Sequence, residues 1–302
     1  MSAAEFTFRR PRHEDVDIAA EILAAEERSL RGESRQGVDE ISDWWRLFNL
    51  EDGSWIVETQ AGERVAFSGL IESQDHYPTW VVVHPSFTGR GVATDLLGRA
   101  EARVRQLGGA HVNAGMLAEN EAARNLLTSL GFQEIRRFYQ MEIALDQPPE
   151  PLDPPVGFTI EPFRSEDARA FHAAMNEAFA DDWGFHAMSF EDWKPFRLEA
   201  PGTDVSLWFV ARAGEEIAGV LRGDGRKFGG GWVGALGVRK QWRRRGLAAA
   251  LLRHAFAEYG RRGEVRVGLG VDAQNETGAT RLYERAGMRI RAEDVIFQKA
   301  LT

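Results

Sequence analysis

Short stretches in which apolar and polar residues alternate recur along the chain, separated by glycine-containing turns and longer amphipathic segments. Alternation with a period of two is typical of strands, whereas apolar residues three or four positions apart are typical of helices. Helices and a final hairpin are expected around a mixed set of strands, an order that favours an α/β (α+β) fold. The strands are predicted at residues 6–9, 55–58, 66–71, 79–83 and 111–117, and again at 158–161, 208–212, 217–221, 232–238 and 265–271.

The same order of elements occurs twice, which indicates an internal repeat. Phe6-Thr7 recurs as Phe158-Thr159, 152 residues later, and Ala61-Gly62-Glu63 recurs at the same distance. Between the copies, segment 146–156 contains five prolines, which exclude both a helix and a central strand. We therefore predict an N-terminal domain at 1–145, a proline-rich linker at 146–156 and a C-terminal domain at 157–302, each large enough for its own core.

A basic glycine turn follows the predicted strand 232–238 and opens a helix. It reads Arg243-Arg244-Arg245-Gly246-Leu247-Ala248, and Ala249 continues the helix. Glycine lets the main chain approach phosphate oxygens, while the N–H groups of a helix start and three guanidinium groups favour an anion. The turn predicts a diphosphate site; the alternative is a capped, solvated surface turn.

A second motif lies downstream, where Asn275 is followed eight residues later by Tyr283 and then by Gly287-Met288. Together with Arg243, Gly246 and Ala248, these residues resemble the nucleotide motif and the later motif of the GCN5-related N-acetyltransferase (GNAT) superfamily. Many members have a spacing of seven between the Asn and Tyr positions. We interpret Thr277-Gly278-Ala279 as a helix start that is one residue longer.

The N-terminal half carries a degraded copy of both motifs. Its nucleotide turn comprises Val83, Thr88, Gly89, Arg90, Gly91, Val92 and Ala93, and its later motif comprises Asn120, Ala123, Gly131 and Phe132. Thr88 stands where the family has Gln or Arg, and Leu127 stands where the tyrosine belongs. Leucine cannot donate a proton, so we predict that this half is inactive. It either binds coenzyme A without reaction or serves as a scaffold.

The resemblance implies tandem acyl-CoA N-acyltransferase domains, each with a centrally splayed sheet, and acetyl-CoA as the donor. The pantetheine arm would pair with the strand edge at Leu236, Gly237 and Val238, as a peptide strand does in β-augmentation. The diphosphate would lie on the turn from Arg243 to Ala249, and Asn275 would contact the cofactor. By resemblance, Tyr283 is the general acid that protonates the leaving thiolate.

In this superfamily the first two helices and the junction between them cover the acceptor site. We therefore expect the acceptor site at the loop formed by residues 179–193. Residues 179–193 are rich in aromatic and acidic side chains, and Asp181, Asp182 and Trp183 would suit a cationic amine. The alternative is a helix pair that packs its aromatic residues inward. No general base stands out; the candidates are Asp181, Asp182, Asp224, Asp272, Glu293, Asp294, His172 and His186.

Composition narrows the function classes. The chain has no cysteine, which excludes an acyl-enzyme on a thiol, and its net charge of −9 argues against nucleic acid as the main partner. No apolar run is long enough to cross a bilayer, and no signal peptide is recognisable. We expect a cytoplasmic protein without a metal or a membrane partner. The sequence indicates no oligomeric state.

The sequence therefore predicts an acetyl-CoA-dependent N-acetyltransferase that moves an acetyl group directly to a primary amine of a small molecule or peptide. One alternative is a non-catalytic acyl-CoA sensor. The tandem layout is also similar to that of the mycothiol synthases, which acetylate a cysteinyl amino-sugar. The chain departs from them on the fourth strand, where Trp232 replaces a carboxylate.

Overall fold

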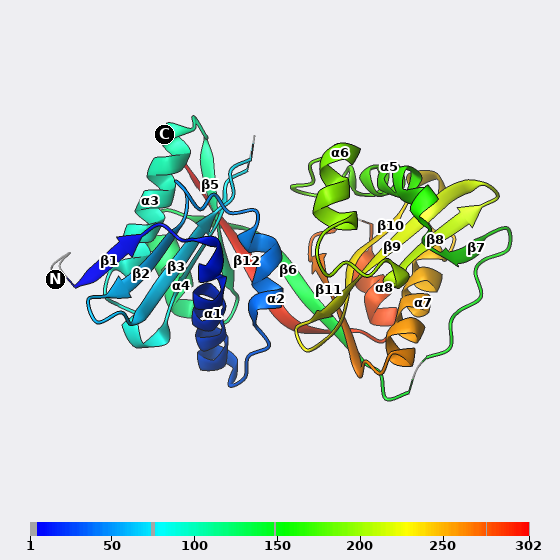
Figure 1. Cartoon of the computed structure of the whole chain (residues 1–302), viewed down its shortest axis with the longest axis horizontal. Helices are drawn as coiled ribbons and strands as arrows, with labels where there is room; N and C mark the ends of the chain where they lie inside the picture. The colour runs from blue at the N-terminus through cyan, green and yellow to red at the C-terminus, as the bar shows by residue number, and fades with distance from the viewer. Residues whose placement is uncertain (1–4, 74–75, 148, 276, 302) are drawn as a thin grey trace. The chain divides into compact units, whose positions relative to one another are not determined.

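The computed structural model describes residues 5–73, 76–147, 149–275 and 277–301 (Figure 1). The chain forms two compact units: unit 1 comprises Met1–Phe138 and Ala292–Thr302, and unit 2 comprises Tyr139–Arg291. The segment 292–302 belongs to unit 1, so the two units differ from the predicted domains 1–145 and 157–302. Those domain ranges describe the sequence repeats and stay a prediction. None of the helices in the described ranges is long and apolar enough to cross a membrane.

Unit 1 is a mixed sheet with helices on both faces. Its strand order is β1-β2-β3-β4-β5-β12, and β4 and β5 are parallel whereas the other pairs that have a described register are antiparallel. The strands are β1 (Phe6–Arg9), β2 (Trp55–Thr59), β3 (Arg64–Leu70), β4 (Pro78–Val83), β5 (His111–Leu117) and β12 (Arg289–Ala300). The helices are α1 (Val16–Arg31), α2 (Val38–Trp45), α3 (Val92–Gln106) and α4 (Glu121–Ser129).

The alternation of apolar residues explains why both faces of this sheet are covered. Neighbouring side chains on β2 point to opposite faces, and Ile56 and Val57 are both fully buried. Ile56 lies in a cluster with Ile22 of α1, whereas Val57 lies in a cluster with Leu96 of α3. The sheet is therefore the middle of three layers.

Unit 2 repeats this plan with the strand order β6-β11-β10-β9-β8-β7. Its α7 is amphipathic with a wide apolar face, from Leu247 through Leu251 to Tyr259, and this face is buried. The strands are β6 (Gln133–Ala144), β7 (Thr159–Pro162), β8 (Trp208–Ala213), β9 (Glu216–Lys227), β10 (Gly230–Val238) and β11 (Arg266–Asp272). The helices are α5 (Ala168–Phe179), α6 (Phe190–Trp193), α7 (Leu247–Arg261) and α8 (Ala279–Arg285).

The end of each repeat differs from the predicted hairpin. Residues 289–300 form the single strand β12, and residues 133–144 form the single strand β6, each of 12 residues. Neither segment contains the Gly, Pro or Asn that a tight turn requires, so the chain stays extended. Segment 146–156 has neither helix nor strand, as predicted, in its described residues; residue 148 lies outside them.

The parallel strands part in both units. In unit 2, β10 and β11 are paired from Gly231 and Val267 to Val233 and Leu269, and no further pairs follow in the described part of the chain. In unit 1, β4 and β5 are paired in the same way from Pro78 to Trp80. The sheet is thus splayed at its centre, and β10 runs on to Val238 with one edge open.

Candidate functional site

The open edge of β10 is the first part of the site. Its residues from Ala235 to Val238 pair with β9 on one side, after a bulge between Val233 and Ala235. Beyond Val233 the other edge is not paired with β11, which leaves main-chain groups available to an extended ligand. The end of α5 lies over this strand, because a Cβ added at Gly237 would be 2.7 Å from the Cβ of Ala178.

The glycine turn after β10 is the second part. Gly246 precedes α7 with a φ of +87°, and Arg244 also adopts a left-handed φ, +61°. No acceptor among the described residues binds the N–H groups of Arg244, Arg245 and Gly246. The first N–H groups of α7 also lack partners inside the helix. This row of free N–H groups at a positive helix end suits an anion.

The three arginines of this turn do not act alike. The guanidinium of Arg243 donates to the carbonyl oxygens of Val238 (3.1 Å) and Ala178 (2.8 Å). That of Arg245 lies over the ring of Trp242 at 5.0 Å, and Arg244 is exposed. Main-chain carbonyls thus occupy part of the Arg243 guanidinium, and a role for this residue in binding an anion stays a prediction.

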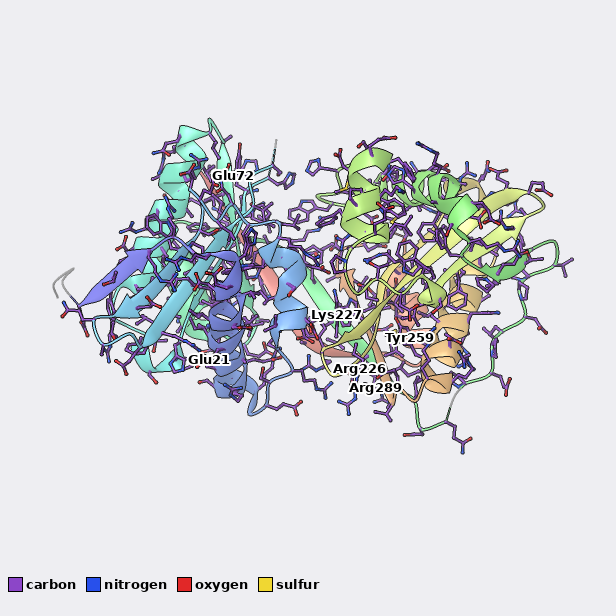
Figure 2. All side chains as sticks on the ribbon, viewed as in Figure 1. Glu21, Glu72, Arg226, Lys227, Tyr259 and Arg289 are labelled. Atoms are coloured by element: carbon purple, nitrogen blue, oxygen red, sulfur yellow. The ribbon has the colours of Figure 1, made fainter. Side chains whose placement is uncertain are left out.

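Tyr283 of α8 is buried in the core of unit 2, with 7% of its surface exposed. Burial raises the pKa of Tyr283 above its ordinary range, and the Asp182 carboxylate raises this pKa further. Its hydroxyl has no hydrogen-bond partner among the described residues. In contrast, Tyr259 of α7, labelled in Figure 2, donates to the carbonyl oxygens of Asp224 and Trp232, both at 2.6 Å. Tyr283 thus keeps a protonated, uncommitted hydroxyl.

Asn275 lies before α8 and lines a hollow of about 420 Å³. Its side chain accepts from the N–H (2.9 Å) and the hydroxyl of Thr277. The helix begins only at Ala279, after Gly278 with a φ of +81°. The interpretation of a longer helix start is therefore wrong, because the extra residue is taken up by a turn. The hollow is lined by Ala273, Asn275, Thr277, Gly278, Thr280 and Arg281.

The two aspartates of the predicted acceptor loop face different partners. Asp181 is exposed and pairs with Lys240 at 2.7 Å, and this hydrogen bond lowers the pKa of Asp181. Asp182 is near enough to Tyr283 to raise its pKa. Trp183 beside it is half-buried. The structure thus brings Asp182 together with the predicted acid, whereas Asp181 contacts Lys240, which precedes the glycine turn.

Several other candidates for a general base belong to unit 1 or already have a hydrogen-bond partner. Glu293 and Asp294 belong to unit 1, and Asp224 is paired with Arg222 at 2.5 Å. The ring of His172 bonds the carbonyl oxygen of Met188 at 2.9 Å, and Asp272 accepts from the N–H of Gln274.

Sequence reasoning missed the role of one tryptophan. Trp232 pairs with Gly268 where β10 and β11 part, and its ring fills the space over that glycine, because an added Cβ would lie 2.7 Å from it. Trp80 and Gly115 form the same pair in unit 1, where the corresponding distance is 2.9 Å. Aligning the two repeats would have revealed this matched pair.

The corresponding turn in unit 1 keeps its backbone shape. Gly89 and Gly91 have φ angles of +75° and +82°, and Gly91 precedes α3. Arg90 pairs with Glu5 at 2.9 Å, while the hydroxyl of Thr88 donates to the carbonyl of Pro85 in the same turn. Leu127 is buried in the core. Unit 1 therefore keeps the glycine turn but has a buried leucine at the position of Tyr283.

Comparisons with known proteins agree with this geometry. A sequence model described as the acetyltransferase (GNAT) family matches residues 19–132 and 168–288. A mycothiol acetyltransferase of Thermobispora bispora is 31% identical over 287 residues, which cover 92% of this chain and 95% of the relative.

Solved structures show the same architecture. A GCN5-related N-acetyltransferase from Sphaerobacter thermophilus has a TM-score of 0.84 and 31% identity, and the match covers 98% of this chain and 96% of that one. A tandem GNAT protein from the clavulanic acid biosynthesis pathway shares the fold, with a TM-score of 0.74, 15% identity and 99% coverage of both chains. These findings confirm the predicted fold class, the tandem layout and the N-acetyltransferase activity. The chain belongs to the acetyltransferase (GNAT) family.

Proposed function

We propose that unit 2 binds acetyl-CoA and transfers its acetyl group directly to a primary amine of a small molecule. One observation carries this proposal: the open edge of β10 leads into a turn whose N–H groups at Arg244, Arg245 and Gly246 have no acceptor among the residues that the structure describes. The edge suits the amides of a pantetheine arm, and the turn suits a diphosphate. Their order along the chain matches the order of these groups in coenzyme A.

The chemistry requires an uncharged amine and a protonated leaving group. With a reference pKa of about 10.4, deprotonating a lysine-like amine at pH 7 costs about 4–5 kcal/mol, so a nearby carboxylate helps. Asp182 is the candidate for this carboxylate, because it is near enough to Tyr283 to raise the pKa of that tyrosine. The amine nitrogen forms the C–N bond as the C–S bond breaks. Tyr283 donates its proton to the sulfur and regains one, through solvent, from the attacking nitrogen.

The acceptor is proposed from the loop that follows α5. Asp182 and Trp183 offer a carboxylate and an aromatic ring, which together favour a cationic amine before it loses its proton. A cysteinyl amino-sugar is the first acceptor to test, because relatives named mycothiol acetyltransferase are about 30% identical. Trp232 on β10 narrows the space beside β11, and β10 itself carries no carboxylate.

Calorimetry with acetyl-CoA, followed by thiol release with a panel of amines, tests the proposal. We expect one equivalent of acetyl-CoA if unit 1 is a scaffold and two if its cradle still binds. The double variant Arg244→Ala, Arg245→Ala should weaken binding about tenfold or more, since each charge-assisted contact is worth about 1.5–3 kcal/mol.

The matched control is Arg261→Ala, at the other end of α7, where Arg261 pairs with Glu258. It should bind acetyl-CoA like the wild type. Acetyl-CoA binding without thiol release across the panel would favour the sensor instead. No binding by the wild type would reject both functions.

A further inference from the structure

Three basic side chains join the segment between β10 and α7 to the end of α5. The Nε of Arg239 lies 2.7 Å from the carboxylate of Glu177, and the Nη2 of Arg243 donates to the carbonyl of Ala178 at 2.8 Å. One residue after Arg239, the Nζ of Lys240 lies 2.7 Å from the carboxylate of Asp181. All three start between β10 and α7, and their partners lie where α5 ends and the acceptor loop begins.

Arg243 is the central member of this group. Its planar guanidinium also donates to the carbonyl of Val238, the last residue of β10, at 3.1 Å. One side chain therefore binds the end of the open strand and the end of the helix above it. A cation at the carbonyl end of a helix is favourable, because those carbonyls lack partners and carry the negative end of the helix dipole.

Unit 1 offers an internal comparison. Thr88 occupies the position of Arg243, and its hydroxyl donates to Pro85 at 3.1 Å, within its own turn. Thr88 is too short to bridge from the turn to a helix. The bridge by an arginine is thus found in the unit that also has the tyrosine, Tyr283, and is replaced in the unit that has Leu127.

We propose that Arg243 is a positioning residue that couples donor binding to the order of the acceptor loop. This inference rests on the proposed donor site. An anion on the N–H groups of Arg244 to Gly246, which have no acceptor in the described ranges, fixes the turn, and Arg243 passes that restraint to Ala178 and hence to residues 180–189. Because such coupling is reciprocal, an ordered loop also strengthens donor binding. Lys240 and Arg239 support the same connection.

Hydrogen exchange of residues 179–189, measured with and without coenzyme A, tests this coupling without requiring an acceptor. In the wild type, coenzyme A should slow exchange in this loop about tenfold, the factor that corresponds to one charge-assisted hydrogen bond. In Arg243→Gln, coenzyme A should bind up to about tenfold more weakly by calorimetry, as reciprocity requires, yet at saturation slow loop exchange no more than about twofold. Arg261→Gln is the control and should keep the wild-type response.

Two results would overturn the inference. A purely structural role predicts that Arg243→Gln speeds loop exchange equally with and without coenzyme A, so that the tenfold effect of the ligand persists. A role as a phosphate ligand alone predicts that Arg243→Gln weakens coenzyme A binding, yet that saturating coenzyme A still slows loop exchange about tenfold. If the wild type itself does not bind coenzyme A, calorimetry shows that the proposed function has failed rather than the coupling alone.

Discussion

At the scale of single residues, two buried tyrosines of unit 2 show how the same side chain serves different purposes. The Tyr259 hydroxyl is bound by two carbonyl oxygens, and burial raises the pKa of Tyr259. The Tyr283 hydroxyl is equally protonated but makes no such bond among the described residues. Because its hydroxyl makes no bond within the described part of the chain, Tyr283 is the better candidate for contact with a ligand.

Phenylalanine substitutions should separate these purposes. Tyr283→Phe should lower kcat about 100-fold, the usual contribution of a general acid, with little change in coenzyme A affinity. Tyr259→Phe should instead lower the free energy of unfolding by about 1–3 kcal/mol, because two carbonyls lose their donor. Steady-state kinetics and thermal unfolding of both variants test this. An unchanged kcat in Tyr283→Phe would remove it from the mechanism.

Glu26 of α1 gives a pH-dependent prediction for unit 1. Burial raises the pKa of Glu26 to about 7, with Asp294 also raising it, while a hydrogen bond from Asn120 at 2.7 Å and the charge of Arg31 lower it. The folded-state pKa exceeds the ordinary value of 4.5. The neutral form is therefore favoured by folding, and its stabilisation is lost as the pH rises from about 4.5 to about 7.

The variant Glu26→Gln should remove this loss. We expect it to raise the free energy of unfolding by about 3 kcal/mol at most at pH 8, and to change it little at pH 4.5, where Glu26 is protonated in the folded protein. Urea unfolding at both pH values measures this difference. Glu21→Gln, at an exposed position of the same helix (Figure 2), is the control. Equal shifts at both pH values would contradict the assignment.

At the scale of elements, the turn before α7 depends on a backbone conformation that favours glycine. An alanine at Gly246 would meet Pro155 only at an ordinary contact distance of 3.5 Å, so the cost comes from its φ of +87°. Gly263, after the other end of α7, has a φ of +84° and also has open space around it. The two positions therefore share a left-handed φ without a close contact, but only Gly246 belongs to the predicted diphosphate turn.

Alanine at either glycine should lower the free energy of unfolding by about 1–2 kcal/mol, the cost of a left-handed residue with a Cβ. Gly246→Ala should also weaken acetyl-CoA binding, since a Cβ and a shifted turn move the free N–H groups. Gly263→Ala should bind acetyl-CoA normally. Chemical denaturation and calorimetry on both variants provide the measurements; equal binding losses would show that the effect is one of stability.

Much of the fold follows from the sequence, because alternation and turn residues are local signals. The strands β1 and β5 match their predicted ranges, and the splay implied by the resemblance is confirmed at Val233 and Leu269. The hydrogen bond from Arg243 to Ala178 could not be predicted from such local signals, because every residue type has a main-chain carbonyl. The turn at Thr277 and Gly278 was missed because one added residue fits either a helix or a turn.

At the scale of the whole molecule, the path of the chain is the feature that the repeats did not reveal. Strand β12 pairs with β5 from Asp294 to Ala300, so the C-terminal segment completes the sheet of unit 1. Val295 and Phe297 of this strand are 0% and 2% exposed, within the core of unit 1. A period of 152 residues predicts two similar units, but it does not say which copy receives each last strand.

Removing residues 292–302 should therefore destabilise unit 1, although they are distant from it in sequence. The single change Phe297→Ala should lower the free energy of unfolding by about 3–5 kcal/mol, as for other buried aromatic residues. Limited proteolysis should then cut first within residues 5–138. Lys299→Ala, at a partly exposed position of the same strand, is the control. Early cleavage confined to residues 139–291 would contradict this assignment of the strand.

This routing has a consequence during synthesis. The ribosome makes most of unit 1 first, yet the strand that covers β5 emerges only after all of unit 2 has been translated. Until then the nascent chain exposes an unprotected sheet border, a surface prone to association with other strands. Maturation of the leading half must therefore wait until residues 292–302 have been translated, and gene fragments that encode either half alone would yield incomplete proteins.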